Sequence, residues 1–319
     1  MDEQVKIFIE KIKGANSIAI MGHKNPDGDS LCSALALARL IELNFNKRPV
    51  CVYDGNVPDF LDGVPLRGYM HYYERVNLAD SYDLVIIVDY GTANQIGGPE
   101  IIAKSAKYVI EIDHHRNENP IGAQLCINDL SAVATGQIVY EIIAAGKLTY
   151  DLDIANLLMI SLITDTGQFR FVQSGRPMRI AADLIDFGVN IRELISELGV
   201  KNRKTLQVEA RAVANAEFLY KNHLALAIIP HSDYKFLDGK GDTAMRLLAQ
   251  VRDVECVVLL KQQKQNQIGI SIRSRIQPIG HIASALGGGG HPCAAGALVY
   301  DSIENVRMRI IELFRGEFK

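Results

Sequence analysis

Short apolar runs that lack polar alternation constrain the fold of this chain more than any other feature. The first half of the chain contains such runs at "SIAIMG" (17–22), "PVCVY" (49–53), "YDLVIIVD" (82–89) and "KYVIEID" (107–113). Helical patterns accompany them at 30–43, 132–146 and 152–164. Apolar strands without alternation are typical of a sheet covered on both faces, and strands that alternate with helices indicate parallel pairing. We therefore predict an α/β domain with a parallel sheet and helices on both faces.

The second half of the chain has a different pattern. Residues 187–213 are charged and helical, and no strand-like run interrupts them. Strand-like runs return at 223–230, 254–263, 267–275 and 296–301, and a last helical pattern begins at about residue 303. We predict a first domain at 1–186, a helical linker at 187–213 and a smaller α+β domain at 214–319.

Charge and composition exclude several classes of function. The chain has 319 residues, 48% of them hydrophobic, and a formal net charge of −3, which is the profile of a soluble globular protein. This charge argues against a protein that binds long duplex nucleic acid, which needs a strong positive excess. The five cysteines form no C-x-x-C pair, which favours reduced thiols. No segment resembles a signal peptide or a membrane span, so we predict a cytoplasmic protein.

Acidic residues and histidines gather where the predicted strands end. They are His23, Asp27 and Asp29 after the first strand, Asp89 after the third, and Asp113, His114 and His115 after the fourth. In an open parallel sheet, ligands bind beyond the carboxyl ends of the strands. If these strands are neighbours, the side chains converge on one edge, where Asp165, at the end of a long apolar helix, can join them.

Each of these residues also has a structural explanation. Asp29 is a good N-cap for the helix that follows it, and Asp27-Gly28 is ordinary turn chemistry. A single histidine is more often a packed or surface residue than a ligand. The explanations weaken in combination, because the three polar residues of "DHH" (113–115) directly follow a buried strand.

The composition of the group indicates metal binding. Carboxylates with fewer imidazoles and no thiolate suit Mn²⁺ or Mg²⁺ better than structural zinc. About six ligands suit two ions roughly 3.5–4 Å apart that share one carboxylate, as in phosphoryl-transfer hydrolases. Two ions would also offset the repulsion between crowded carboxylates. We expect Pro26 and Gly28 to bend the loop so that His23 and Asp27 face one ion and Asp29 the other.

Four motifs, taken in order, resemble those of the DHH phosphoesterase family. They are "GHKNPDGDS" (22–30), "VDYG" (88–91), "DHH" (113–115) and "TDTGQF" (164–169). The glycine-rich "GGGGHPCAAGA" (287–297) resembles the signature of the DHHA1 domain that accompanies them. The resemblance covers almost the whole chain, and the ordered set is far more specific than any single motif.

The resemblance implies a set of ligands for two divalent ions, with Mn²⁺ favoured over Mg²⁺: His23, Asp27, Asp29, Asp89, His114 and Asp165. In that arrangement Asp89 bridges the two ions. His115 would face the substrate phosphate as an acid or an electrostatic stabiliser, and Asp113 would orient a histidine. The implied reaction is hydrolysis of a phosphoester, with the ions sharing the developing charge.

The second domain offers candidates for substrate binding. They are Arg273, Ser274 and Arg275 in "SIRSR", and Gly288, Gly289, Gly290 and His291 in the glycine-rich segment. Arginine stays charged and binds phosphate in a bidentate way, and glycines allow a ligand to approach the backbone. The alternative for the glycine run is a flexible hairpin or a helix-end loop.

Two domains with an active-site cleft between them suit a short ligand with phosphates at both ends. The whole-chain build resembles the nanoRNase and pAp phosphatase group of the family. This implies exonucleolytic hydrolysis of short oligoribonucleotides, hydrolysis of 3′-phosphoadenosine 5′-phosphate, or both. Related proteins hydrolyse cyclic di-AMP or its linear product, and the motifs leave that alternative open. We expect short RNA oligonucleotides or small nucleotides as partners, with no membrane, and a homodimer is compatible with the sequence.

Three residues depart from the family pattern near the expected site. Gln95 stands where many relatives have Arg, Cys32 where Gly is common, and Arg116 where Pro is frequent. A pyrophosphatase or exopolyphosphatase is a rival enzyme, although few Lys or Arg residues accompany the motifs. A non-catalytic nucleotide-binding protein would lack at least one motif residue, and none of the six proposed ligands is missing.

Overall fold

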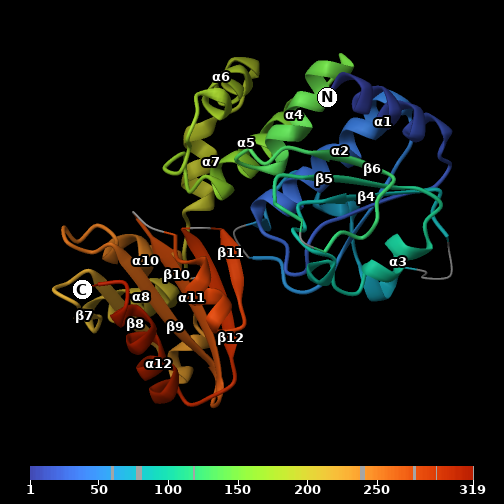
Figure 1. Ribbon diagram of the computed structural model, residues 1–319. Coiled ribbons are helices and arrows are strands. Elements are labelled where there is room, and N and C mark those ends of the chain that lie inside the picture. The colour runs from blue at the N-terminus through green and yellow to red at the C-terminus, as the bar shows by residue number, and fades with distance from the viewer. Residues whose placement is uncertain are drawn as a thin grey trace. The chain divides into compact units, whose positions relative to one another are not determined.

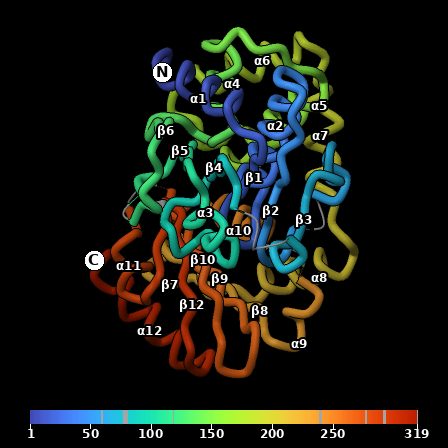
Figure 2. Tube along the Cα trace, turned by 90° about the vertical axis from the view of Figure 1, so that its right-hand side faces the viewer, coloured from blue at the N-terminus to red at the C-terminus, as the bar shows by residue number. Residues whose placement is uncertain are grey.

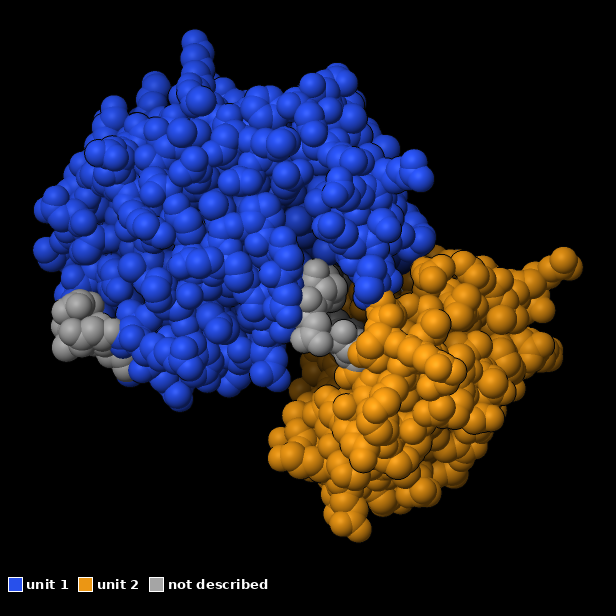
Figure 3. Space-filling view, turned by 180° about the vertical axis from the view of Figure 1, so that it is seen from behind, with its two compact units in different colours: residues 1–200 blue, residues 201–319 orange. Residues whose placement is uncertain are grey.

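The computed structural model describes residues 1–58, 61–76, 81–117, 119–237, 241–275, 278–291 and 293–318. The chain forms two compact units, residues 1–200 and 201–319, which Figure 3 colours separately. Helix α7 (Ile191–Leu198) lies in the first unit and α8 (Arg203–Ala214) in the second. The segment predicted as a linker (187–213) contains α7 and all but the last residue of α8, so the division between the units passes through it.

The first unit is built on a six-stranded sheet in which every pairing is parallel (Figure 1). In spatial order the strands are β3 (Met70–Tyr72), β2 (Val50–Tyr53), β1 (Ile18–Met21), β4 (Leu84–Val88), β5 (Val109–Asp113) and β6 (Leu125–Asn128). Figure 2 shows this order from β3 on the right to β6 on the left. The predicted parallel sheet is confirmed, and the edge strands β3 and β6 extend it beyond the four strands that the sequence indicated.

Helices cover both faces of this sheet. Ile18 and Ile20 of β1 pack in one core, and Ala19 and Met21 pack in the opposite core. The helices of the first core are α1 (Asp2–Gly14), α2 (Gly28–Phe45), α4 (Thr135–Gly146), α5 (Leu152–Asp165) and α6 (Arg176–Phe187). Helix α3 (Glu100–Ser105) packs in the second. Because successive strand residues point to opposite faces, a strand covered on both faces favours apolar residues in succession, as in β1 and β4.

Short 3-10 helices in the first unit and a mainly antiparallel sheet in the second unit complete the fold. In the first unit the 3-10 helices are η2 (Arg67–Tyr69), η3 (Tyr73–Arg75) and η4 (Ala93–Gln95). The sheet of the second unit has the order β11 (Gly289–His291), β12 (Ala294–Val299), β10 (Gln267–Ser274), β9 (Cys256–Lys264), β8 (Leu224–Ile229) and β7 (Glu217–Leu219). Its strands pair antiparallel except for the parallel pair β8 and β9.

Helices also pack on both faces of the second sheet. One core contains residues of α11 (Gly280–Ala285) and α12 (Ile303–Arg315), and the other contains residues of α8 and α10 (Asp242–Leu248). The short helix α9 (His231–Tyr234) follows β8. The smaller α+β domain predicted from the sequence is therefore confirmed in its class. No helix of the described residues is both long and apolar enough to cross a membrane.

Candidate metal centre

The register of the central strands brings the acidic motifs to one edge of the first sheet. Met21, the last residue of β1, pairs with Ile87 of β4, and Val88, the last residue of β4, pairs with Ile112 of β5. These neighbouring strands therefore end at nearly the same level, and the residues that follow them meet. That edge carries the loop after β1, Asp89 after β4 and the 113–115 segment at the end of β5.

His23, Asp27 and Asp89 form one group of potential ligands. The Nε2 atom of His23 lies 3.5 Å from Asp27 Oδ1 and 3.7 Å from Asp89 Oδ2. Asp27 also caps helix α2, because its carboxylate accepts hydrogen bonds from the backbone N–H groups of Asp29 and Ser30. The N-cap is therefore Asp27 rather than Asp29, and capping fixes the carboxylate beside His23.

Asp29, His114 and Asp165 form a second group. The Nε2 atom of His114 lies 3.8 Å from Asp29 Oδ2 and 3.5 Å from Asp165 Oδ2. Asp29 lies in the first turn of α2, His114 directly follows β5, and Asp165 is the last residue of α5. In both groups, one potential ligand atom from each residue lies within 4.8 Å of the others.

Asp89 belongs to the first group and also reaches the second. Its Oδ2 lies 3.7 Å from His23 Nε2, and its Oδ1 lies 3.5 Å from His114 Nε2. The backbone of Asp89 is in the left-handed region, with a φ of 49°, and the side chain is only 4% exposed. Strained backbone at a buried polar residue is a frequent feature of functional sites. The two oxygens of Asp89 thus face one histidine of each group.

Asp29 is held by four hydrogen bonds that the sequence analysis did not foresee. Its Oδ1 accepts from Ser33 Oγ at 3.0 Å, Ser161 Oγ at 2.5 Å and the backbone N–H of Gly136 at 3.1 Å. Its Oδ2 accepts from the backbone N–H of Thr135 at 2.7 Å. The last two donors lie at the start of α4, where the helix dipole also favours an anion. In the sequence, the only sign of these hydrogen-bond donors is a small polar residue within a mainly apolar helical segment, as at Ser33 and Ser161.

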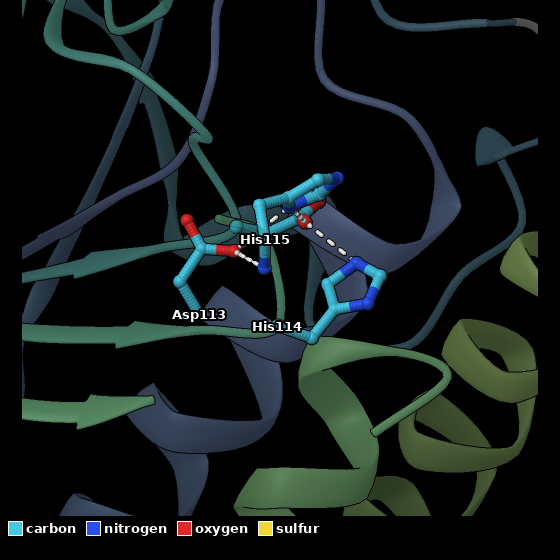
Figure 4. A group of neighbouring side chains, drawn as sticks. Asp113, His114 and His115 are labelled. Atoms are coloured by element: carbon cyan, nitrogen blue, oxygen red, sulfur yellow. Dashed lines mark hydrogen bonds and ion pairs between the residues drawn. The ribbon is translucent and has the colours of Figure 1, made fainter. Parts of the chain in front are cut away.

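Asp113 and His115 form a pair beside the two groups. Asp113 Oδ1 lies 2.8 Å from His115 Nδ1, and Figure 4 shows the carboxylate turned toward that residue. The same oxygen accepts from the backbone N–H of His115, and Oδ2 accepts from those of Tyr90 and Gly91. Asp113 is fully buried. Its hydrogen bonds therefore fix the position of His115.

The electrostatics of the cluster favour positive charge within it. Burial lowers the pKa of His23, but hydrogen bonding to Asp27 and the charge of Asp89 outweigh it and raise the pKa to about 9. Burial also lowers the pKa of His114, and the surrounding carboxylates, Asp89 first, raise it to about 9. Burial and the neighbouring Asp89 raise the pKa of Asp29 to about 6. The crowded carboxylates therefore favour the protonated form of the neighbouring histidines, and the carboxyl of Asp29 itself retains a proton more readily than usual.

The donors fit divalent cations of the oxygen-preferring type. The two groups supply carboxylate oxygens and imidazole nitrogens, and no thiolate belongs to any donor group in the described part of the chain. Such donors suit Mn²⁺ and Mg²⁺. A third group of potential ligands contains Asp89, Asp113, His114 and His115, and it overlaps the first two. In this group, Oδ2 of Asp113 already accepts hydrogen bonds from two backbone N–H groups. The raised pKa values of the histidines are consistent with a site shaped for cations.

The substrate-binding candidates lie in the second unit on and after β10 and along β11. The guanidinium of Arg273 donates to the carbonyl of Ile272 at 3.0 Å, and that of Arg275 donates to the carbonyl of Arg252 at 3.2 Å. Ser274, between the two arginines, is buried. The structure thus places two cations near the end of one strand.

Two of the candidate glycines have a packing reason of their own. A Cβ on Gly288 would lie 2.0 Å from the carbonyl oxygen of Gly296, and one on Gly290 would lie 2.6 Å from that of Ala294. The close approach of β11 to β12 therefore excludes side chains there, whether or not a ligand binds. Gly289 has open space where its Cβ would be. The side chain of His291 lies outside the described part of the structure.

Comparisons with known proteins agree with the motifs. Residues 17–162 match the DHH family, N-terminal domain, and residues 235–319 match the DHHA1 domain. The bifunctional oligoribonuclease and PAP phosphatase NrnA of Thermus thermophilus is 28% identical over 319 residues, which cover 99% of this chain and 94% of the relative. The cyclic-di-AMP phosphodiesterase GdpP of Bacillus subtilis is 24% identical over 330 residues, which cover 96% of this chain and 49% of that protein.

The fold also matches a solved structure over nearly its full length. The crystal structure of an exopolyphosphatase-related protein from Bacteroides fragilis has a TM-score of 0.89 and 20% identity, and covers 99% of this chain and 96% of that one. At this identity the likeness concerns the fold alone. The two matched domains and the parallel sheet with its cluster of aspartates and histidines lead to one conclusion: the chain combines a DHH-family N-terminal domain in its first unit with a DHHA1 domain in its second.

Proposed function

We propose that this protein hydrolyses short oligoribonucleotides from one end, and 3′-phosphoadenosine 5′-phosphate, with two bound Mn²⁺ ions. The observation that carries the proposal is that Asp89, a member of one group of metal donors, also reaches His114 of the other group. A carboxylate that contacts two ions suits the two-metal sites of enzymes that hydrolyse phosphoesters. The substrate class is supported by the Thermus thermophilus relative, which is named for these two substrates and matches the chain along its whole length.

Each donor group would hold one ion. We assign His23 and Asp27 to the first ion, and Asp29, His114 and Asp165 to the second, with Asp89 contacting both. Such ions, when bound, lower the pKa of water and stabilise charge on phosphoryl oxygens. The chain's own contribution is to hold these donors in place, since Asp29 and Asp89 are buried and accept hydrogen bonds from Ser161 and Thr135, respectively.

His115 is the proposed residue for contact with the reacting phosphate. Burial lowers its pKa, but Asp113 and then Asp89 outweigh this effect and raise the pKa to about 11. A protonated imidazole fixed by Asp113 offers a positive charge and a proton to a phosphate oxygen. Bound cations would reduce this pKa, so a proton on His115 would become easier to transfer in the loaded enzyme.

The second unit would bind the rest of the substrate. The guanidinium groups of Arg273 and Arg275 suit a second phosphate, because arginine forms paired hydrogen bonds with that group. Ser274 and His291 would add hydrogen bonds. The backbone of Gly288, Gly289 and Gly290 would accommodate the ligand most readily at Gly289, where the structure leaves open space.

Hydrolysis of a cyclic or linear adenine dinucleotide is the second candidate. It is supported by the similarity to the cyclic-di-AMP phosphodiesterase GdpP, which spans 96% of this chain. The same pair of ions would serve either phosphodiester, so the metal centre does not distinguish the two candidates.

A parallel hydrolysis assay with Mn²⁺ tests the proposal. The substrates are a diribonucleotide, 3′-phosphoadenosine 5′-phosphate, cyclic di-AMP and pyrophosphate, and the Asp89→Ala variant is the control for contaminating activity. We expect the fastest turnover with the first two substrates. A preference for cyclic di-AMP would favour the second candidate, and a preference for pyrophosphate would contradict both. If none of the four substrates is hydrolysed, the result would support a nucleotide-binding protein instead.

A further inference from the structure

We propose that Asp54 is a positioning residue that fixes the loop between His23 and Asp27 for metal binding. Asp54 directly follows β2, and it is only 5% exposed. It belongs to none of the donor groups found among the described residues. The inference rests on the proposed two-metal function. It gives a role to a buried carboxylate that is not itself a proposed metal ligand.

Asp54 holds the loop after β1 through both its main chain and its side chain. Its carbonyl oxygen accepts a hydrogen bond from the backbone N–H of Asn25 at 2.8 Å. Its Oδ2 lies 3.4 Å from Lys24 Nζ. Lys24 and Asn25 lie between the two proposed ligands, His23 and Asp27, so both contacts act on the segment that sets their separation.

The turn at Asn25 is locked by the same loop after β2. Asn25 has a φ of 54°, a left-handed conformation that asparagine tolerates better than most residues. Its Oδ1 accepts a hydrogen bond from the backbone N–H of Asn56 at 3.0 Å. A Cβ on Gly55 would lie 2.2 Å from that oxygen, so glycine at this position leaves room for the contact. The bend between the two ligands is thus fixed from outside its own loop.

Asp54 also reaches the loop after β4. Its Oδ2 accepts a hydrogen bond from the backbone N–H of Gly98 at 3.0 Å, and a Cβ on Gly97 would lie 2.4 Å from the same oxygen. The carbonyl of Gln95 in that loop accepts from the backbone N–H of Lys24 at 2.5 Å. This contact uses a backbone atom, so the departure at Gln95 from the family's arginine leaves it intact.

One carboxylate therefore ties together the loops that follow three adjacent strands, β2, β1 and β4. All three loops lie at the edge of the sheet that carries the donors. A buried carboxylate is costly unless it is paired, and here Lys24 Nζ and the backbone N–H of Gly98 are both partners of Oδ2. Residues that orient metal ligands typically contribute 10–100-fold to metal affinity. In the loop after β1, the contacts of Asp54 act on the segment between His23 and Asp27, so the geometry predicts a selective effect on the ion that these two residues hold.

Asp83 provides a matched control. It precedes β4, accepts hydrogen bonds from the backbone N–H groups of Asn16 and Ser17 ahead of β1, and pairs with Lys107 Nζ at 2.7 Å. It therefore joins β1 and β4, two of the three strands that Asp54 connects, by the same kinds of contact, but at their amino ends, away from the donors. A loss of metal affinity that comes only from weakened strand packing would appear in the variants of both residues.

The test is calorimetric titration of Mn²⁺ into the metal-stripped full chain for wild type, Asp54→Ala, Asp54→Asn and Asp83→Ala. We expect Asp54→Ala to weaken one of two binding events by about 10–100-fold and to leave the other unchanged. Asp54→Asn should lose less, because the amide oxygen can still accept from Gly98. Asp83→Ala should bind both ions as wild type does, even if it unfolds at a lower temperature.

Three results would overturn the inference: two unaltered events in Asp54→Ala, an equal loss at both sites, or the same loss in Asp83→Ala. If Asp54→Ala does not fold, Asp54→Asn and Asn25→Gly carry the test, because glycine keeps the left-handed turn and removes only the bond to Asn56. Both should still show a selective loss. A wild type that binds fewer than two ions would instead contradict the proposed function, so the two failures are distinguishable.

Discussion

Replacing Ser161 with alanine should destabilise the first unit by an amount that depends on pH. Ser161 is fully buried in α5, and its Oγ donates to Asp29 Oδ1 at 2.5 Å. A hydrogen bond to a charged group contributes about 1.5–3 kcal/mol to stability. We therefore expect the metal-stripped variant to lose about 1.5–3 kcal/mol of unfolding free energy at pH 8, where Asp29 is ionised.

The loss should be smaller at pH 5. Burial and Asp89 raise the pKa of Asp29 to about 6 in the folded protein, above its ordinary value, so the carboxyl is protonated at pH 5. A raised carboxyl pKa means that stability falls as the pH rises through about 6, because the folded state must then hold an unfavourable charge. Ser161 stabilises that charge, so its removal deepens the fall on the alkaline side.

Urea unfolding of the metal-stripped protein at pH 5 and pH 8 measures this difference. The control is Ser105→Ala, since Ser105 Oγ donates to the backbone carbonyl of Ile102 and should give a small loss that is independent of pH. An equal loss for Ser161→Ala at both pH values, or no loss at pH 8, would show that Ser161 does not stabilise a charged Asp29.

Three further predictions concern the reaction itself. Asp89→Ala removes a carboxylate that lies within 3.7 Å of three imidazole nitrogens, so it should abolish hydrolysis of a diribonucleotide. The circular dichroism spectrum should be retained, and measurable turnover would contradict the bridging role. Arg273→Ala should raise KM for the diribonucleotide and leave the Mn²⁺ stoichiometry unchanged, and an unaltered KM would remove Arg273 from the substrate site. Chelation of metal ions should inactivate the enzyme and Mn²⁺ should restore it, whereas full activity in excess chelator would argue against metal-dependent hydrolysis.

The centre of the first sheet could be predicted from the sequence, and its edges could not. Strands β1, β4 and β5 are buried on both faces, so β1 and β4 are uninterrupted apolar runs and β5 is apolar except for Glu111 and its last residue, Asp113. The edge strand β6 alternates buried and exposed residues over only four positions, and β3 has no buried residue. Such short segments take strand structure from their neighbours rather than from their own pattern.

The candidate ligands were also visible in the sequence, because each lies in a short motif at a strand or helix end. The residues that hold these ligands in place by hydrogen bonds could not be recognised from the sequence. Ser161 reaches Asp29 across 132 residues and Thr135 across 106, and no local pattern connects residues so far apart. Asp54 is a single carboxylate that accepts from the backbone N–H of Gly98, and a backbone group leaves no trace in residue identity.

A crystal structure with Mn²⁺, with ions located by anomalous scattering, tests the central claim most directly. We expect two manganese peaks about 3.5–4 Å apart. Both should contact Asp89, one beside His23 and Asp27 and the other beside His114. A single peak, or two ions that share no contact with Asp89, would contradict the account.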